Sequence, residues 1–194
     1  MDYAGLRAKA REQLGGSITN SAWLMAGVVC IIVGAISGLV GSVIPYIGSY
    51  IVIGVMSYGM AYVFLNQSRD QQPINISDVF IAFNSDFLEY FLLGLMISIF
   101  TALWSLLFVI PGIVKGYAYA MAYYIKVDNP EMGWKECIDE SQKMMEGHKM
   151  ELFVLDLTFI GWIFVGAFTC GIGFFWVAPY INAAHVKFYE SIRA

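Results

Sequence analysis

Residues 13–68 read QLGGSITNSAWLMAGVVCIIVGAISGLVGSVIPYIGSYIVIGVMSYGMAYVFLNQS and contain no Asp, Glu, Lys or Arg. A membrane-spanning helix needs about 20 apolar residues to cross about 30 Å of hydrocarbon. The stretch is therefore too long for one crossing and has about the length of two crossings joined by a turn. Two further apolar runs follow, at residues 90–114 and from residue 157 almost to the C-terminus. The pattern predicts an all-α, polytopic transmembrane helical bundle.

The composition agrees with this class, because 59% of the 194 residues are hydrophobic and only 13% are charged. A typical soluble domain has about 25% charged residues. The length allows one membrane domain, residues 1–194. The net charge of −4, without a long basic block, excludes a nucleic-acid partner. Cys30, Cys137 and Cys170 form no CxxC motif and no disulfide framework, so we interpret them as small buried hydrophobic residues.

Charges, glycines and prolines divide the apolar runs into six expected spans, at about 23–43, 48–66, 87–109, 112–126, 150–169 and 173–189. Residues 87–127 would otherwise form one helix of roughly 60 Å, twice the thickness of the hydrocarbon core. We expect the break at Pro111-Gly112, because proline removes a backbone donor and clashes with the preceding turn. The other turns are expected at Gly41, Pro45 and Gly48, and at Gly171 and Gly173. The six spans then form three hairpins.

Positive charge sets the expected orientation. Six spans place ten of the eleven basic residues on one side, which the positive-inside rule identifies as cytoplasmic. Both termini are therefore expected inside, in a multi-pass protein of the cell membrane. The ten residues are Arg7, Lys9, Arg11, Arg69, Lys126, Lys135, Lys143, Lys149, Lys187 and Arg193.

A polar or amphipathic segment precedes each hairpin on this side, at residues 2–14, 75–83 and 131–147. In the last, Asn129 can cap the helix and Pro130 suits its first position. Its apolar face is too large to leave in water, and its acidic residues outnumber its lysines, which disfavours anionic lipid. We therefore expect helix 131–147 to be held by protein contacts and to offer an acidic surface to a possible protein partner.

The C-terminal half resembles a known family. The strings IPGIVKGYAYAMAYYI from Ile110, DNPEMGW from Asp128, SQKMMEGHKMELFVLDLTFIGW from Ser141 and TCGIGFFWVAPYINAA from Thr169 are similar to domain-of-unknown-function family 975. Its members are integral membrane proteins found mainly in Gram-positive bacteria. The resemblance covers residues 103–189 and implies a bacterial cytoplasmic membrane and a shared helical fold. It implies no activity.

Asp156 lies about two turns inside the fifth expected span. A carboxylic acid at this depth costs about 2.5–3.5 kcal/mol on insertion scales and needs a partner. The sixth span brings Asn182 and His185 to about the same level, so either could form a hydrogen bond to Asp156. This candidate intramembrane polar site has two readings: a proton or cation site, or a buried polar tie between helices. We favour the tie, because interhelical polar contacts are common in membrane proteins.

Lys115 follows Pro111-Gly112 by about one turn, so we expect it near the outer surface, roughly 15 Å from the depth of Asp156. A direct ion pair between the two is therefore not expected. One reading is that the ammonium of Lys115 extends to the lipid headgroups. The other is that it binds a lipid phosphate between spans, as a lipid-headgroup contact.

The sequence contains no HExxH, GxSxG or P-loop motif, and no catalytic constellation, metal site or cofactor site is evident. We expect an integral membrane protein of unassigned activity, a non-enzymatic accessory or scaffold protein with membrane lipids as partners. The alternative is a small transporter or lipid-handling protein that uses intramembrane Asp156 and Lys115. The sequence does not indicate an oligomeric state.

Overall fold

The computed structural model describes residues 2–16, 21–43, 47–70, 73–83, 87–169, 171 and 173–193, with side chains described outside 40–53, 70 and 107. All regular elements in these ranges are helices, which confirms the all-α prediction. They are α1 (Tyr3–Gln13), α2 (Ser21–Val43), α3 (Ile47–Asp70), the 3-10 helix η1 (Ile76–Phe83), α4 (Phe87–Leu107), α5 (Val109–Tyr119), α6 (Ala122–Asp128), α7 (Trp134–Met144), α8 (Lys149–Leu157), α9 (Ile160–Phe168) and α10 (Phe174–Ile192). The expected turn at Pro45 and the position of Cys170 lie outside the described residues.

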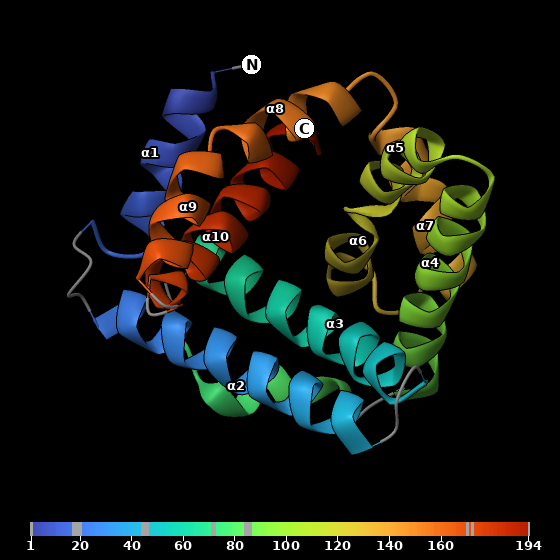
Figure 1. Ribbon diagram of the computed structural model, residues 1–194, viewed down its shortest axis with the longest axis horizontal. Coiled ribbons are helices and arrows are strands. Elements are labelled where there is room, and N and C mark those ends of the chain that lie inside the picture. The colour runs from blue at the N-terminus through green and yellow to red at the C-terminus, as the bar shows by residue number, and fades with distance from the viewer. Residues whose placement is uncertain are drawn as a thin grey trace.

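The helices surround a central region in three groups (Figure 1). Helices α2 and α3 lie side by side, α4 and α5 pack with α7, and α1 packs along α10 beside α9. Short α6 lies between α3 and α7. By length and composition, three segments of the described chain can cross a membrane: Ser21–Leu39, Phe87–Leu106 and Lys149–Phe168. The structure thus gives three candidate spans where the sequence predicts six.

The break between α4 and α5 occurs earlier than the expected Pro111-Gly112. Helix α4 ends at Leu107, and Phe108 alone adopts an extended backbone, with φ −156° and ψ 140°. Pro111 therefore lies in the first turn of α5, where a missing backbone donor removes no helical hydrogen bond. Gly112 then packs directly on α4, because a Cβ built there would lie 2.1 Å from Oγ of Ser105. The glycine permits the close hairpin, and the proline begins its second helix.

Two of the expected spans are divided. The range 112–126 contains the end of α5, a turn at Ala120-Met121 and most of α6. The range 150–169 contains α8 and α9, separated at Thr158-Phe159. Thr158 Oγ1 donates to the carbonyl of Leu155 at 2.6 Å. A threonine hydroxyl that bonds to a carbonyl of the preceding turn competes with the backbone hydrogen bonds of the helix and often bends it. The last range, 173–189, contains the single helix α10, which continues to Ile192.

The helices cross steeply and are not all parallel. Trp23, near the start of α2, donates from Nε1 to the carbonyl of Trp176, near the start of α10, at 3.1 Å. In six parallel spans these two positions would lie on opposite sides of the membrane. Helices α3 and α4 cross closely where Gly54 meets Gly94, since a Cβ on Gly54 would lie 2.8 Å from Cα of Gly94. Small residues at the crossing allow this approach.

The amphipathic segment predicted at 131–147 forms a shorter helix, α7, from Trp134 to Met144. Asn129 does not cap its start; it ends α6, where its Nδ2 donates to the carbonyl of Ile125 at 3.3 Å. Gly133 caps α7 instead, and its N–H donates to the carboxylate of Glu136 at 3.1 Å. The helix is held by protein contacts, as expected, and these include contacts with α4, α5 and α6.

Candidate functional site

The first candidate site surrounds Asp156, near the end of α8. Its Oδ1 lies 2.7 Å from Nε2 of His185 on α10, and its Oδ2 accepts a hydrogen bond from the phenol of Tyr117 on α5 at 3.0 Å. The predicted contact with His185 is therefore present. Tyr117 was missed, because a tyrosine in an apolar helix has the ordinary interpretation of an interfacial anchor. Both carboxylate oxygens are engaged by side chains of other helices.

Asn182 lies one turn before His185 on α10, but no hydrogen bond joins it to Asp156 in the described structure. Its Nδ2 donates to the carbonyl of Ala178 at 2.9 Å, one turn back on the same helix. The depth argument placed Asn182 correctly along the helix and assigned it the wrong partner. Of the three residues proposed for one polar site, the structure brings together Asp156 and His185.

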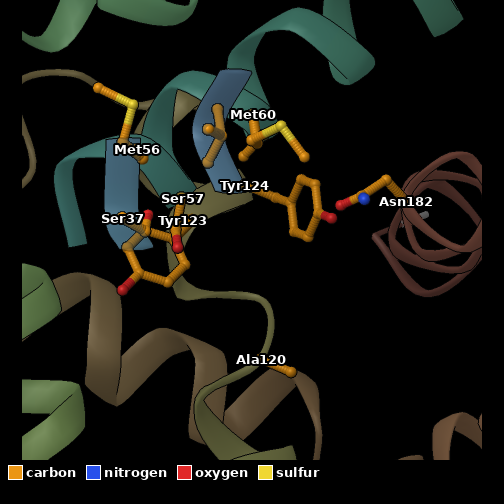
Figure 2. A pocket seen from close by; sticks show the side chains of 10 residues that line it. Ser37, Met56, Ser57, Met60, Ala120, Tyr123, Tyr124 and Asn182 are labelled. Atoms are coloured by element: carbon orange, nitrogen blue, oxygen red, sulfur yellow. The ribbon is translucent and has the colours of Figure 1, made fainter. Parts of the chain in front are cut away.

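Asn182 instead lines a central cavity of about 240 Å³ between α2, α3, α6 and α10. The phenol of Tyr124 on α6 points toward the Asn182 amide across it (Figure 2). Tyr123 hydrogen-bonds to Ser57 at another part of the wall. The ten lining residues are Val33, Ser37, Met56, Ser57, Met60, Ala61, Ala120, Tyr123, Tyr124 and Asn182. The lining combines methionines with hydroxyl and amide groups and contains no charged side chain, which suits a small neutral molecule.

Lys115 does not lie where the sequence analysis placed it. Its Nζ donates to Oε1 of Gln142 on α7 at 3.0 Å and lies 5.3 Å from the ring centroid of Trp104 on α4. Two residues further along α5, Tyr117 is bonded to Asp156. Lys115 is thus beside the helix expected on the cytoplasmic side, and a depth difference of 15 Å from Asp156 is not supported.

A second carboxylate cluster, around Asp128, was not predicted as a site. Asp128 is the last residue of α6, and its side chain is only 2% exposed. It forms a two-pronged ion pair with Arg69 in the last turn of α3, with one contact at 3.0 Å, and a second ion pair with Arg193 after α10 at 2.8 Å. The phenol of Tyr189 on α10 donates to the same carboxylate. The ends of α3, α6 and α10 therefore meet at one carboxylate.

The groups around Asp128 favour its charged form. Burial by itself raises the pKa of Asp128, but the hydrogen bonds from Arg69 and Tyr189 and the charges of Arg69 and Arg193 outweigh it and hold the pKa below its usual value. The hydrogen bond to Asp128 likewise raises the pKa of Arg69. The signal in the sequence was a basic residue at the end of α3 and another after α10. The sequence did not identify Asp128 as their shared partner, because Asp128 follows a predicted span and resembles a solvated loop residue.

Lys126 and Glu89 fix the start of α7 against α4 and α6. The ammonium of Lys126 is 2% exposed, donates to the carbonyls of Pro130 and Met132 at 2.9 and 2.6 Å, and lies 3.8 Å from the carboxylate of Glu89. Glu89 also accepts from the backbone N–H of Trp134 at 3.1 Å. On α7 itself, burial raises the pKa of Cys137 to about 11, so the thiol stays protonated and unreactive at neutral pH.

The family comparison supports the resemblance noted above. Residues 107–194 match the model of DUF975, described as a protein of unknown function. The resemblance to this family is thus confirmed over these residues, which include α5 to α10 and both Asp128 and Asp156. No curated protein and no solved structure matches the chain.

Proposed function

We propose that this chain is a non-enzymatic accessory or scaffold protein integral to the bacterial cell membrane. The observation that carries the proposal is the use of both oxygens of Asp156 by protein side chains, His185 and Tyr117, from two other helices. A carboxylate engaged in this way ties α5, α8 and α10 together. Polar ties of this kind are ordinary stabilising contacts between helices in lipid. The membrane location is supported by three helical segments that are long and apolar enough to cross a membrane.

The proposed topology has three hairpins that enter the membrane from the cytoplasm, with both termini inside. The proposed hairpins are α2–α3, α4–α5 and α8 to α10, one for each pair of predicted spans. The meeting of α3, α6 and α10 at Asp128 supports this, because six spans require their C-terminal ends to lie on the same side. The contact of Trp23 with Trp176 requires α10 to be strongly tilted across α2.

Accessibility of introduced cysteines tests this orientation. In a chain with Cys30, Cys137 and Cys170 changed to alanine, Lys143→Cys places a thiol on α7 at a position whose native side chain is 73% exposed. An impermeant maleimide should label it only after the cells are permeabilised. Labelling in intact cells would contradict the orientation. Native Cys137 cannot serve as the reporter, because it is fully buried.

The accessory role also rests on the outer face of α7 and its flanks. The inner face is buried at Cys137, Ile138 and Ser141. The exposed acidic residues are Glu131, Glu136, Asp139 and Glu146, against the exposed basic residues Lys135 and Lys143. Lys126 and Glu89 hold the start of this helix. We propose its outer face as the surface for a protein partner with a basic patch.

A small transporter is the second candidate, favoured by the central cavity of about 240 Å³ beside α10. Its hydroxyl and amide lining could hydrate or bind a neutral solute inside the membrane region. Purified protein in proteoliposomes separates the two functions. An accessory protein should not increase the flux of small neutral solutes or protons above that of empty vesicles. A flux that Asn182→Leu abolishes would instead establish the transporter.

A further inference from the structure

The end of the α4–α5 hairpin has a sharp boundary between an apolar surface and a polar one. The apolar part consists of exposed large side chains on both helices: Leu103, Trp104, Leu106, Phe108, Val109, Ile110, Ile113 and Val114, with exposures of 40–85%. The next residue after Val114 is Lys115, and beyond it α5 packs against α7, which carries exposed charges. A lipid bilayer has an apolar hydrocarbon core bordered by charged headgroups. The apolar surface of the hairpin, followed directly by a cation and other charged groups, matches this order.

Lys115 is the ammonium at this boundary, and its charge is not neutralised by the protein. Its partner is the neutral amide of Gln142, and no carboxylate in the described part of the chain lies within 4 Å of it. The rings of Trp104 and Tyr119 lie 5.3 and 6.0 Å from Nζ and stabilise a cation without removing its charge. The side chain is half-buried.

A cavity of about 220 Å³ opens next to Lys115 between α7 and the hairpin. Gln142 and Tyr119, two of the three neighbours of Lys115, are both part of its wall. The wall also holds one cation, Lys135, and one anion, Asp139. With Lys115 beside it, the region has a net charge of +1, from two lysines and one aspartate. Phe100, Trp134 and Ile138 complete the lining with apolar surface.

We propose that Lys115 binds the phosphate of an anionic phospholipid, with the headgroup in the cavity between α7 and α5. The acyl chains would then lie on the exposed surface of Leu103, Trp104 and Ile113, which needs lipid contact in any case. Gln142 orients the ammonium, and Lys135 supplies the second positive charge that favours an anionic headgroup over a zwitterionic one. The inference rests on the membrane location and goes beyond the accessory role, since a scaffold without bound lipid would still fold.

Native mass spectrometry of the purified full chain tests the site. The chain in detergent is mixed with phosphatidylglycerol, and the lipid-bound fraction is compared between the wild type and Lys115→Gln. We expect the affinity to fall about ten-fold, the effect of losing one charge-assisted contact. Lys143→Gln is the matched control, because it makes the same charge change at an exposed ion pair with Glu140 on α7. Its binding should remain within about two-fold of the wild type.

One further variant and two further ligands complete the binding experiment. Lys115→Arg keeps the positive charge and should retain binding, and an unchanged melting temperature of Lys115→Gln should show that its loss of binding does not come from misfolding. Phosphatidylcholine should bind more weakly than phosphatidylglycerol, and inorganic phosphate at millimolar concentration should not displace the lipid. Equal binding by Lys115→Gln, equal binding of phosphatidylcholine, or displacement by inorganic phosphate would each overturn the proposal. Because orientation is measured separately by cysteine labelling, failure here leaves the proposed function standing.

Discussion

Two aspartates, Asp128 and Asp156, are held by the same kinds of groups in very different surroundings. Each accepts a hydrogen bond from a tyrosine phenol and a contact from a basic side chain on α10 or just after it. Asp128 is 2% exposed and faces two guanidinium groups, which stay charged at every relevant pH. Asp156 is 31% exposed and faces one imidazole, that of His185.

The difference assigns separate roles to the two clusters. Three helix ends meet at Asp128, so its removal leaves two cations facing each other across a buried site. Removal of Asp156 breaks polar contacts with two helices but leaves no pair of cations facing each other. Because Asp156 is partly exposed, a side chain that replaces it can turn toward the surroundings. We therefore expect the stability of the chain to depend more on Asp128 than on Asp156, although Asp156 is the residue that the sequence marks as unusual. The following predictions test this order.

The largest effect is expected for Asp128→Ala. A fully buried ion pair that loses one partner costs about 3–5 kcal/mol, and partial exposure of the two arginines, 34% and 47%, should reduce this to about 2–3 kcal/mol. Thermal unfolding in detergent, followed by tryptophan fluorescence, measures the loss. Glu140→Ala removes the exposed partner of Lys143 and should change stability by less than about 1 kcal/mol. Equal effects of the two substitutions would contradict the special position of Asp128.

Acid should remove the same contribution gradually. Because the pKa of Asp128 is lowered on folding, its contribution to stability is fully present above the unfolded pKa of about 3.9 and is lost as the pH falls through the folded value. The stability difference between the wild type and Asp128→Asn should therefore be constant from pH 7 to about pH 5 and shrink below about pH 4. Melting temperatures of both proteins across this range provide the measurement. A difference that grows toward low pH would reverse the sign of the argument.

A smaller effect is expected at Asp156. Asp156→Leu removes the contacts to His185 and Tyr117 and should lower stability by about 1 kcal/mol, the scale of a polar contact between membrane helices. Asp156→Asn should remain close to the wild type, because an amide still forms hydrogen bonds. If the Asn variant is as stable as the wild type but loses a cellular phenotype of the gene, Asp156 acts through its charge and the tie is not its main role.

The sequence predicted the helices and the Asp156–His185 contact well and the packing poorly. Apolar runs determine where helices form, and the contact of Asp156 with His185 was predicted because both residues lie at a similar distance from the turn between their helices. Distances along the chain do not give the packing of separate helices. The contact of Lys115 with α7 and the contacts of Asp128 with α3 and α10 depend on that packing, so the sequence did not predict them. It also placed a break at Pro111 where Phe108 is the residue that turns, because a proline in a first turn is compatible with a helix.

The smallest effect is expected for Tyr117→Phe, which tests whether the hydrogen bond from Tyr117 to Asp156 joins α5 to α8. Tyr117→Phe removes one hydroxyl that donates to Asp156 and keeps the edge-on ring contact with Phe153, whose centroid lies 5.8 Å away. The expected loss is about 0.5 kcal/mol, near the average for such hydrogen bonds in membrane proteins. Combined with Asp156→Leu, the second substitution should cost almost nothing more, because the phenol has already lost its acceptor. Additive losses in this double-mutant cycle would mean that Tyr117 is stabilised by another partner and that Asp156 does not join α5 to α8.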